Sequence, residues 1–176
     1  MDSLKIIAPL DKAFTPIYRS LCDLQARAEK ENGPTLRIAL ERNDGLTAVR
    51  DMRLLPETPE NDALNLTLAE RMIKSMIWVY GGFRVTLAGS RKVYEGVKDQ
   101  YRVSGKREFD AQFMARVYEH DFEVLYAASL AEAPAQKDAS SPIGRHLDGC
   151  RIGFDAGGSD RKVSAGSDGQ SVYSEE

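Results

Sequence analysis

A strand that leads directly into a capped helix is the feature that most limits how this chain can fold. Residues 83–87 alternate as a short strand does, and Gly89-Ser90 then offers a turn and a helix N-cap. Helical periodicity follows to Tyr101 and again over residues 108–118, before a second strand-like run at residues 122–126. Because such a crossover normally joins parallel strands of one sheet, the segment predicts an α/β layer.

The residues before this segment predict the rest of one domain. Apolar residues recur at helical spacing over residues 11–31 and alternate on both sides of Asn43-Asp44-Gly45, as in a β-hairpin. A second amphipathic helix is predicted from about Thr67 to Tyr80, and we expect Trp78 of this helix to pack in the core. Residues 1–130 are therefore expected to form a small N-terminal α/β domain.

Composition excludes several classes of partner. The net charge is -3, with both signs mixed along the chain, which leaves no basic stripe for nucleic acid and no polybasic patch for a membrane surface. No basic and apolar leader begins the sequence, and Lys74 interrupts the longest apolar stretch, so we expect a cytoplasmic protein. Cys22 and Cys150 are expected to be reduced thiols. A homo-oligomer is left open.

The chain changes character after residue 130. Small and polar residues replace large apolar ones in residues 131–141, and we interpret residues 131–146 as a solvated linker. From residue 147 the sequence is strand-like and glycine-rich. Two predicted strands, residues 149–154 and 161–166, enclose the sequence Asp155-Ala156-Gly157-Gly158-Ser159.

The tip of this hairpin has the composition of an anion site. Without side chains at Gly157 and Gly158, backbone N–H groups can approach phosphate oxygens closely, and Ser159 adds a hydroxyl donor. The carboxylate of Asp155 would repel phosphate unless it held Mg²⁺, directly or through water. The pattern therefore predicts a site for Mg-ATP phosphates.

Residues 152–159 resemble the first phosphate motif of the actin, heat-shock-seventy and sugar-kinase superfamily, and with their lead-in they look most like the ROK family (repressors, open reading frames, kinases). The resemblance implies the first β-hairpin of a ribonuclease H-like (actin-like) ATPase domain over residues 147–176. It assigns Asp155 to the Mg²⁺-water position and phosphate contacts to Gly157, Gly158 and Ser159, with Lys162 as a further phosphate ligand.

The resemblance also implies what this chain lacks. The catalytic Asp, the second phosphate loop, the adenosine loop and the zinc-binding cluster of ROK proteins are expected after Glu176, so we expect an N-terminal portion of a sugar kinase that contains no catalytic residue and is inactive alone. ROK kinases usually have Lys where this chain has Asp160. The position of Lys162 is similar to that in activator ATPases of acyl-CoA dehydratases or in glycerol-kinase-type enzymes.

Other interpretations remain open at this point. The hairpin tip could be a tight turn without a ligand, in a non-catalytic sensor whose N-terminal domain contacts a partner. His146 and Cys150 are too few ligands for a zinc site. His120 is expected in a solvated turn rather than in an acid/base pair, and the Asn43-Asp44-Gly45 turn is expected to be structural.

Overall fold

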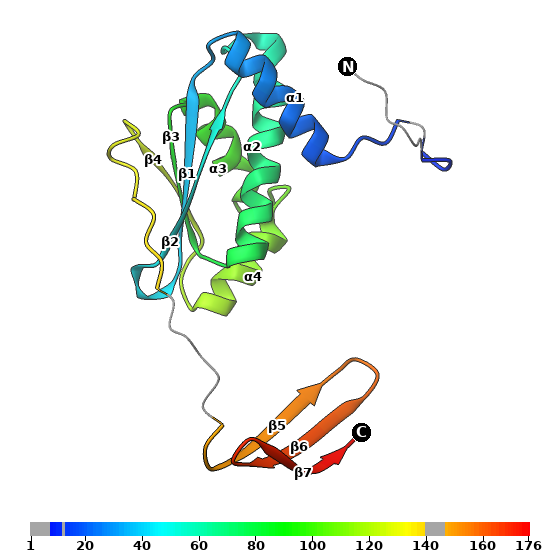
Figure 1. The fold of residues 1–176 in the computed structure, drawn as a ribbon. Coiled ribbons are helices and arrows are strands. Elements are labelled where there is room, and N and C mark those ends of the chain that lie inside the picture. Colours follow the sequence, from blue (N-terminus) through cyan, green and yellow to red (C-terminus); the bar gives the residue numbers. More distant parts are fainter. Residues whose placement is uncertain (1–7, 12, 140–146) are drawn as a thin grey trace. The chain divides into compact units, whose positions relative to one another are not determined.

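The computed structural model describes residues 8–11, 13–139 and 147–176, and the chain divides into two compact units, Met1–Ala139 and Ser140–Glu176 (Figure 1). The first unit combines helices with one four-stranded sheet, and the second contains one three-stranded sheet. The chain is therefore of mixed α/β class, as the sequence predicted.

The sheet of the first unit has the strand order β2-β1-β3-β4. Strands β1 (Thr35–Glu41) and β2 (Thr47–Arg53) form the predicted antiparallel hairpin, closed by the turn Asn43–Gly45. Strand β3 (Arg84–Ala88) runs antiparallel to β1 and parallel to β4 (Glu123–Ala127). The parallel pair confirms the crossover prediction made from the helices between these two strands.

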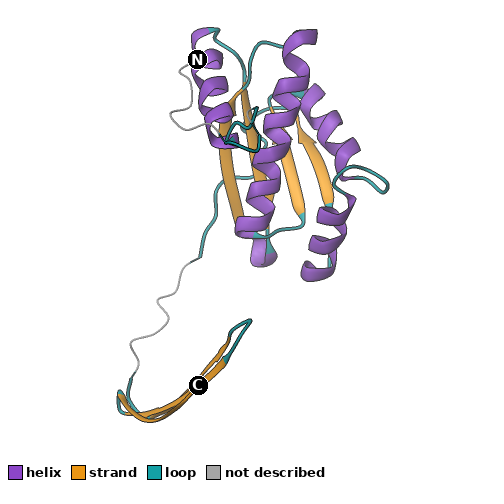
Figure 2. Ribbon diagram, turned by 90° about the vertical axis from the view of Figure 1, so that its right-hand side faces the viewer, coloured by secondary structure: helices purple, strands orange, loops and turns teal. Residues whose placement is uncertain are grey.

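Four helices pack against this sheet, and Figure 2 shows them on one face of it. They are α1 (Ile17–Lys30), α2 (Pro59–Tyr80), α3 (Arg91–Tyr101) and α4 (Glu108–Tyr118). Helix α2 begins eight residues before the predicted start at Thr67, because Thr58 is its N-cap and accepts a hydrogen bond from the amide of Asn61, with Pro59 in the first turn. Among the described helices, none is long and apolar enough to cross a membrane.

The core lies between the helices and the helix-facing side of the sheet. Alternate residues of the central strands are fully buried there, together with one face of α2; they include Leu36, Ile38, Leu40, Ile73, Ile77, Val85 and Leu87. Trp78 was expected among them, but its side chain is 45% exposed. The prediction was wrong because Trp78 follows the buried face of α2 by one position and stacks on Phe113 of α4 instead, at 5.2 Å between ring centroids.

The segment after β4 lies against the first unit. Lys137 and Thr47 exchange backbone hydrogen bonds of 2.8 and 3.0 Å at the outer edge of β2, and the side chain of Gln136 accepts a 2.6 Å bond from the amide of Val49. Ala133 is buried with Ala127 and its neighbours. Residues 131–139, which the sequence analysis assigned to a linker, thus supply partners for the free edge of β2. Residues 140–146, including His146, lie outside the described residues.

The second unit is an antiparallel sheet in which β5 (Cys150–Ala156), β6 (Arg161–Ser167) and β7 (Gln170–Glu175) follow one another. The β5–β6 hairpin was predicted, whereas β7 was not. One face of this sheet is apolar, with cross-strand positions occupied by Ile152, Phe154, Val163, Ala165 and Tyr173. Ile152, Phe154 and Tyr173 keep half or more of their surface exposed, and Val163 and Ala165 are partly buried.

Candidate phosphate-binding hairpin

Strand pairing brings the predicted site residues to one end of the second sheet. The β5–β6 ladder runs from the Cys150–Ser167 pair to the Ala156–Arg161 pair, so the four residues 157–160 form the tip. Asp155 stands directly opposite Lys162 in this ladder. Because cross-strand partners project from the same face of a sheet, the carboxylate and the ammonium group flank the tip together.

The two glycines of the tip differ in the space that a side chain would meet. A Cβ atom on Gly157 would lie 2.6 Å from Oδ1 of Asp160, which is closer than non-bonded atoms approach. A Cβ atom on Gly158 would meet no atom within 4 Å, so this part of the tip is open to solvent. The turn is therefore compact on one side and accessible on the other, and its accessible surface is mostly backbone.

The charged groups beside the tip are exposed. Nζ of Lys162 lies 2.7 Å from Oε1 of Glu176 and 3.8 Å from Oδ2 of Asp160. Exposed pairs of this kind contribute about 0–1 kcal/mol each, so a phosphate group could replace these carboxylates at little cost. Within residues 147–176, Asp155 forms no ion pair within 4.0 Å and its carboxylate is free to meet a cation.

The residues at the tip suit Mg²⁺ only when phosphate supplies further oxygen ligands. No group of three or more His, Cys, Asp or Glu side chains that could hold a metal occurs among the described residues. One carboxylate suits Mg²⁺ when phosphate oxygens and water complete an octahedral shell. Asp155 therefore fits a metal that arrives with a nucleotide and does not form a metal site by itself.

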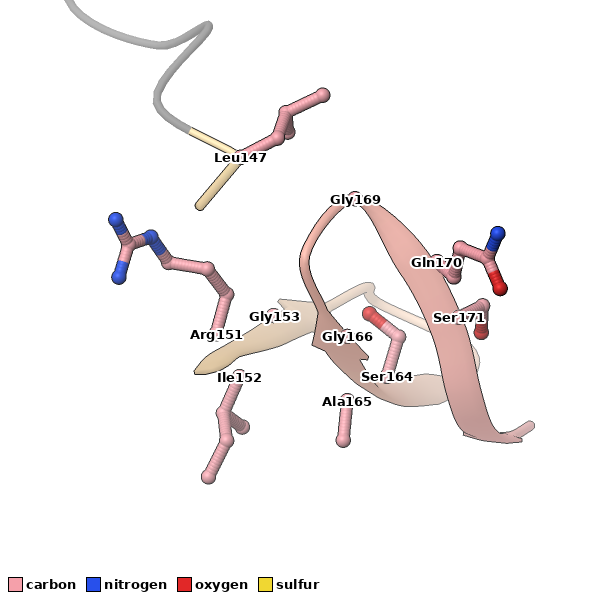
Figure 3. Close-up of a pocket in the computed structure, with 10 residues that line it drawn as sticks. All are labelled: Leu147, Arg151, Ile152, Gly153, Ser164, Ala165, Gly166, Gly169, Gln170 and Ser171. Carbon is pink, nitrogen blue, oxygen red and sulfur yellow. The ribbon is translucent and has the colours of Figure 1, made fainter. Parts of the chain in front are cut away.

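A shallow groove of about 320 Å³ lies at the opposite end of the same sheet. Figure 3 shows its lining, in which Leu147 lies near the β6–β7 turn at Gly169. At its floor Gly153 faces Ser164, whose Oγ would lie 2.8 Å from a Cβ on that glycine. The groove contains none of the predicted phosphate ligands, and nothing in the sequence pattern indicated it.

The two features questioned in the first unit have structural roles. His120 stacks on Phe83 at 4.3 Å between ring centroids, beside the Asn43–Gly45 turn. Arg84 binds Glu41 at 2.9 Å and Glu123 at 2.5 Å, and these hydrogen bonds raise the pKa of its guanidinium. His120 therefore packs on an aromatic ring beside the paired cation Arg84, which lies at the start of the interior strand β3.

A buried charged cluster between α2 and α4 was not predicted at all. The side chains of Glu70, Arg107 and Asp110 are 1%, 10% and 6% exposed. The guanidinium of Arg107 donates a short hydrogen bond to Glu70 and lies 3.7 Å from Oδ2 of Asp110. The bond to Glu70 is the main reason that the pKa of Arg107 is raised. Trp78 donates from Nε1 to Asp110 at 2.8 Å.

This cluster links the connection between α3 and α4 to α2. Burial raises the pKa of the neighbouring Tyr101 phenol, and the hydroxyl of Tyr101 and Nη2 of Arg107 have no hydrogen-bond partner. Arg107 lies in the connection between α3 and α4, so its bond to Glu70 fastens that connection to α2. Because charged residues of both signs are mixed evenly along the sequence, no local pattern indicated this cluster.

Comparisons of this chain with protein-family models, with curated proteins and with solved structures gave no match.

Proposed function

We propose that the β5–β6 hairpin is the first phosphate-binding loop of an ROK-like sugar kinase, in which phosphate is transferred from Mg-ATP to a sugar hydroxyl. The observation that carries the proposal is the hairpin itself: paired strands hold Asp155, an open glycine tip and Lys162 at one end of the sheet. A tip made mostly of backbone is suited to phosphate because its N–H groups can approach the anion without steric hindrance. The resemblance of residues 152–159 to the superfamily motif supports the same assignment.

Each residue has a separate role in this proposal. The amides of Gly157 and Gly158 and the hydroxyl of Ser159 donate to phosphate oxygens. Asp155 would hold Mg²⁺ through water, and a bound Mg²⁺ would supply positive charge to offset the charge on the transferred phosphoryl group. Lys162 exchanges its exposed contacts with Asp160 and Glu176 for a phosphate oxygen.

The hairpin supplies one side of a phosphate site. The proposal places this hairpin in a ribonuclease H-like domain, and it assigns the general base, the second phosphate loop and the sugar contacts to residues other than the 176 of this sequence. The 176-residue chain is accordingly expected to bind phosphate weakly and to turn over no ATP.

An activator ATPase of the same superfamily is the second candidate. One observation favours it: the residue after Ser159 is Asp160, whose carboxylate folds toward Gly157, while the lysine stands two positions later, opposite Asp155. An ATPase and a kinase would use the hairpin in the same way and would differ in the phosphate acceptor, which is water in the first and a sugar hydroxyl in the second.

The test is an amide-resolved NMR titration of the chain with ATP, with and without Mg²⁺. We expect shifts at residues 157–159 with an affinity of about millimolar or weaker, because one loop makes few contacts. Asp155→Asn should abolish the effect of Mg²⁺ while leaving the tip shifts with ATP alone. The matched control is Asp168→Asn at the other end of the same sheet, where a positive φ of 51° tolerates Asn. Shifts elsewhere with none at the tip, or an Asp155→Asn variant that keeps its Mg²⁺ response, would refute the proposal.

A further inference from the structure

Large apolar side chains gather on the outer surface of the helical layer. We call them the helical patch: Phe14, Ile17, Tyr18, Trp78, Phe109, Phe113 and Val117, with exposed fractions between 37% and 76%. Phe14 lies just before α1, and the other residues come from the start of α1, the end of α2 and α4. These helices lie on the same side of the sheet (Figure 1). Isolated exposed apolar residues are ordinary, but a gathering of this size is not.

The helical patch is continuous. Phe14, Ile17, Tyr18 and Trp78 line one open groove of about 770 Å³. Trp78 stacks on Phe113, and Phe113 stacks on Phe109 at 6.0 Å between ring centroids. Phe109, Phe113 and Val117 are four residues apart on α4 and form one row along it.

A row of polar residues runs beside the apolar row of α4. Glu108, Gln112 and Arg116 are also four residues apart. The side-chain amide of Gln112 donates to the carboxylate of Glu108 at 2.9 Å, and the guanidinium of Arg116 donates to the backbone carbonyl of Gln112 at 3.3 Å. The row begins with a negative charge and ends with a positive one. Two such rows placed antiparallel bring each Glu108 opposite the Arg116 of the other, so this surface is complementary in charge to itself.

We propose that the helical patch joins two copies of this chain about a twofold axis, with α4 of one copy antiparallel to α4 of the other. Aromatic side chains of this kind cover about 150–250 Å² each when fully buried, so the patch exposes on the order of 700 Å² of apolar surface. A stable interface of standard size needs about 800 Å² from each partner. The proposal concerns the first unit and does not depend on phosphate binding by the second.

The charge row gives the sharpest experiment. Sedimentation equilibrium of the chain from about 1 μM to about 300 μM covers the affinities of transient interfaces, and we expect a monomer–dimer equilibrium there. Arg116→Glu places two carboxylates opposite each other and should raise the dimer Kd about tenfold, and Glu108→Arg should do the same. The double variant Glu108→Arg with Arg116→Glu restores opposite charges and should return to within about threefold of the original Kd.

The apolar contribution is tested separately. Phe109 is 65% exposed, so Phe109→Ser should not disturb the core, yet it should raise the dimer Kd roughly 30-fold or more if this ring is a central contact. Leu125→Thr is the matched control, because Leu125 is 42% exposed on the opposite face of the sheet, and it should leave the Kd unchanged. Circular dichroism melts check that each variant is folded.

Three results would overturn the proposal. The first is a chain that stays monomeric at the highest concentration, which would assign the helical patch to a different partner. The second is a dimer that Leu125→Thr weakens as much as Phe109→Ser does. The third is a double charge variant whose dimer Kd is no lower than that of either single variant. A parallel arrangement or an unrelated contact would give that result, because the exchanged charges would not face each other.

Discussion

Arg107 offers a direct test of how the first unit is held together. Arg107→Met removes the guanidinium that bonds to Glu70 and leaves a carboxylate that is 1% exposed, with only the half-exposed Arg71 at 4.0 Å as a cation. Breaking a buried ion pair on one side costs about 3–5 kcal/mol, because the remaining charge keeps its desolvation penalty. For a unit of this size such a loss lowers the thermal midpoint by about 10–15 °C, which a melt followed by circular dichroism measures easily.

The control for this prediction is the double variant Glu70→Leu with Arg107→Met. It removes both charges from the same buried site, so its cost should be below about 1–2 kcal/mol. Asp110 keeps its bond from Trp78 and its contact with Lys74 at 3.7 Å in either variant. If Arg107→Met cost less than about 1 kcal/mol, or if the double variant were as unstable as the single one, the reasoning from desolvation would be refuted.

Three further predictions concern local features of the first unit. Thr58→Ala should lower the free energy of unfolding by about 1 kcal/mol through loss of the α2 N-cap, and Thr58→Ser should not. The hydrogen bond from Arg37 lowers the pKa of Asp51, so the stability from this exposed pair is present at neutral pH and is lost as pH falls through the lowered pKa. In a pH titration of unfolding, Asp51→Asn should therefore lose slightly less stability between neutral and acid pH than the original chain, and the difference should be small because the pair is exposed. Hydrogen exchange should find the amides of Thr47 and Lys137 protected, and fast exchange at both would contradict the packing of residues 131–139 on β2.

Local patterns were enough to predict most of the elements. The alternation around Asn43–Gly45 gave the β1–β2 hairpin, and the spacing of apolar residues gave α3 and α4. The β5–β6 hairpin followed from glycine and aspartate between two short apolar runs. Each of these depends on residues close in sequence, for which hydrophobic period and turn chemistry are direct signals.

Contacts between distant residues could not be predicted in this way. Glu70 and Arg107 are 37 positions apart, and each is by itself an ordinary charged residue in a helical context. The pairing of Lys137 with Thr47 depends on β2 being an edge strand, which the order β2-β1-β3-β4 determines and which no local pattern contains. Trp78 was expected in the core because large aromatic residues are often buried. Its position follows the buried Ile77 by one residue on α2, which turns its side chain away from the buried face.

The apolar face of the second sheet bears on how strongly its hairpin can hold phosphate. Ile152 is 81% exposed and Phe154 is 65% exposed, and within residues 147–176 no other layer covers them. A sheet of so few strands gains most of its stability from what packs on its apolar face, so the tip at Gly157–Ser159 is held by strand pairing alone. A binding loop that must be ordered as the ligand arrives loses affinity for that reason. Covering the apolar face should therefore strengthen phosphate binding without any new contact to phosphate. For this chain alone, the same physical argument requires weak binding in which only the response to Mg²⁺ depends on Asp155.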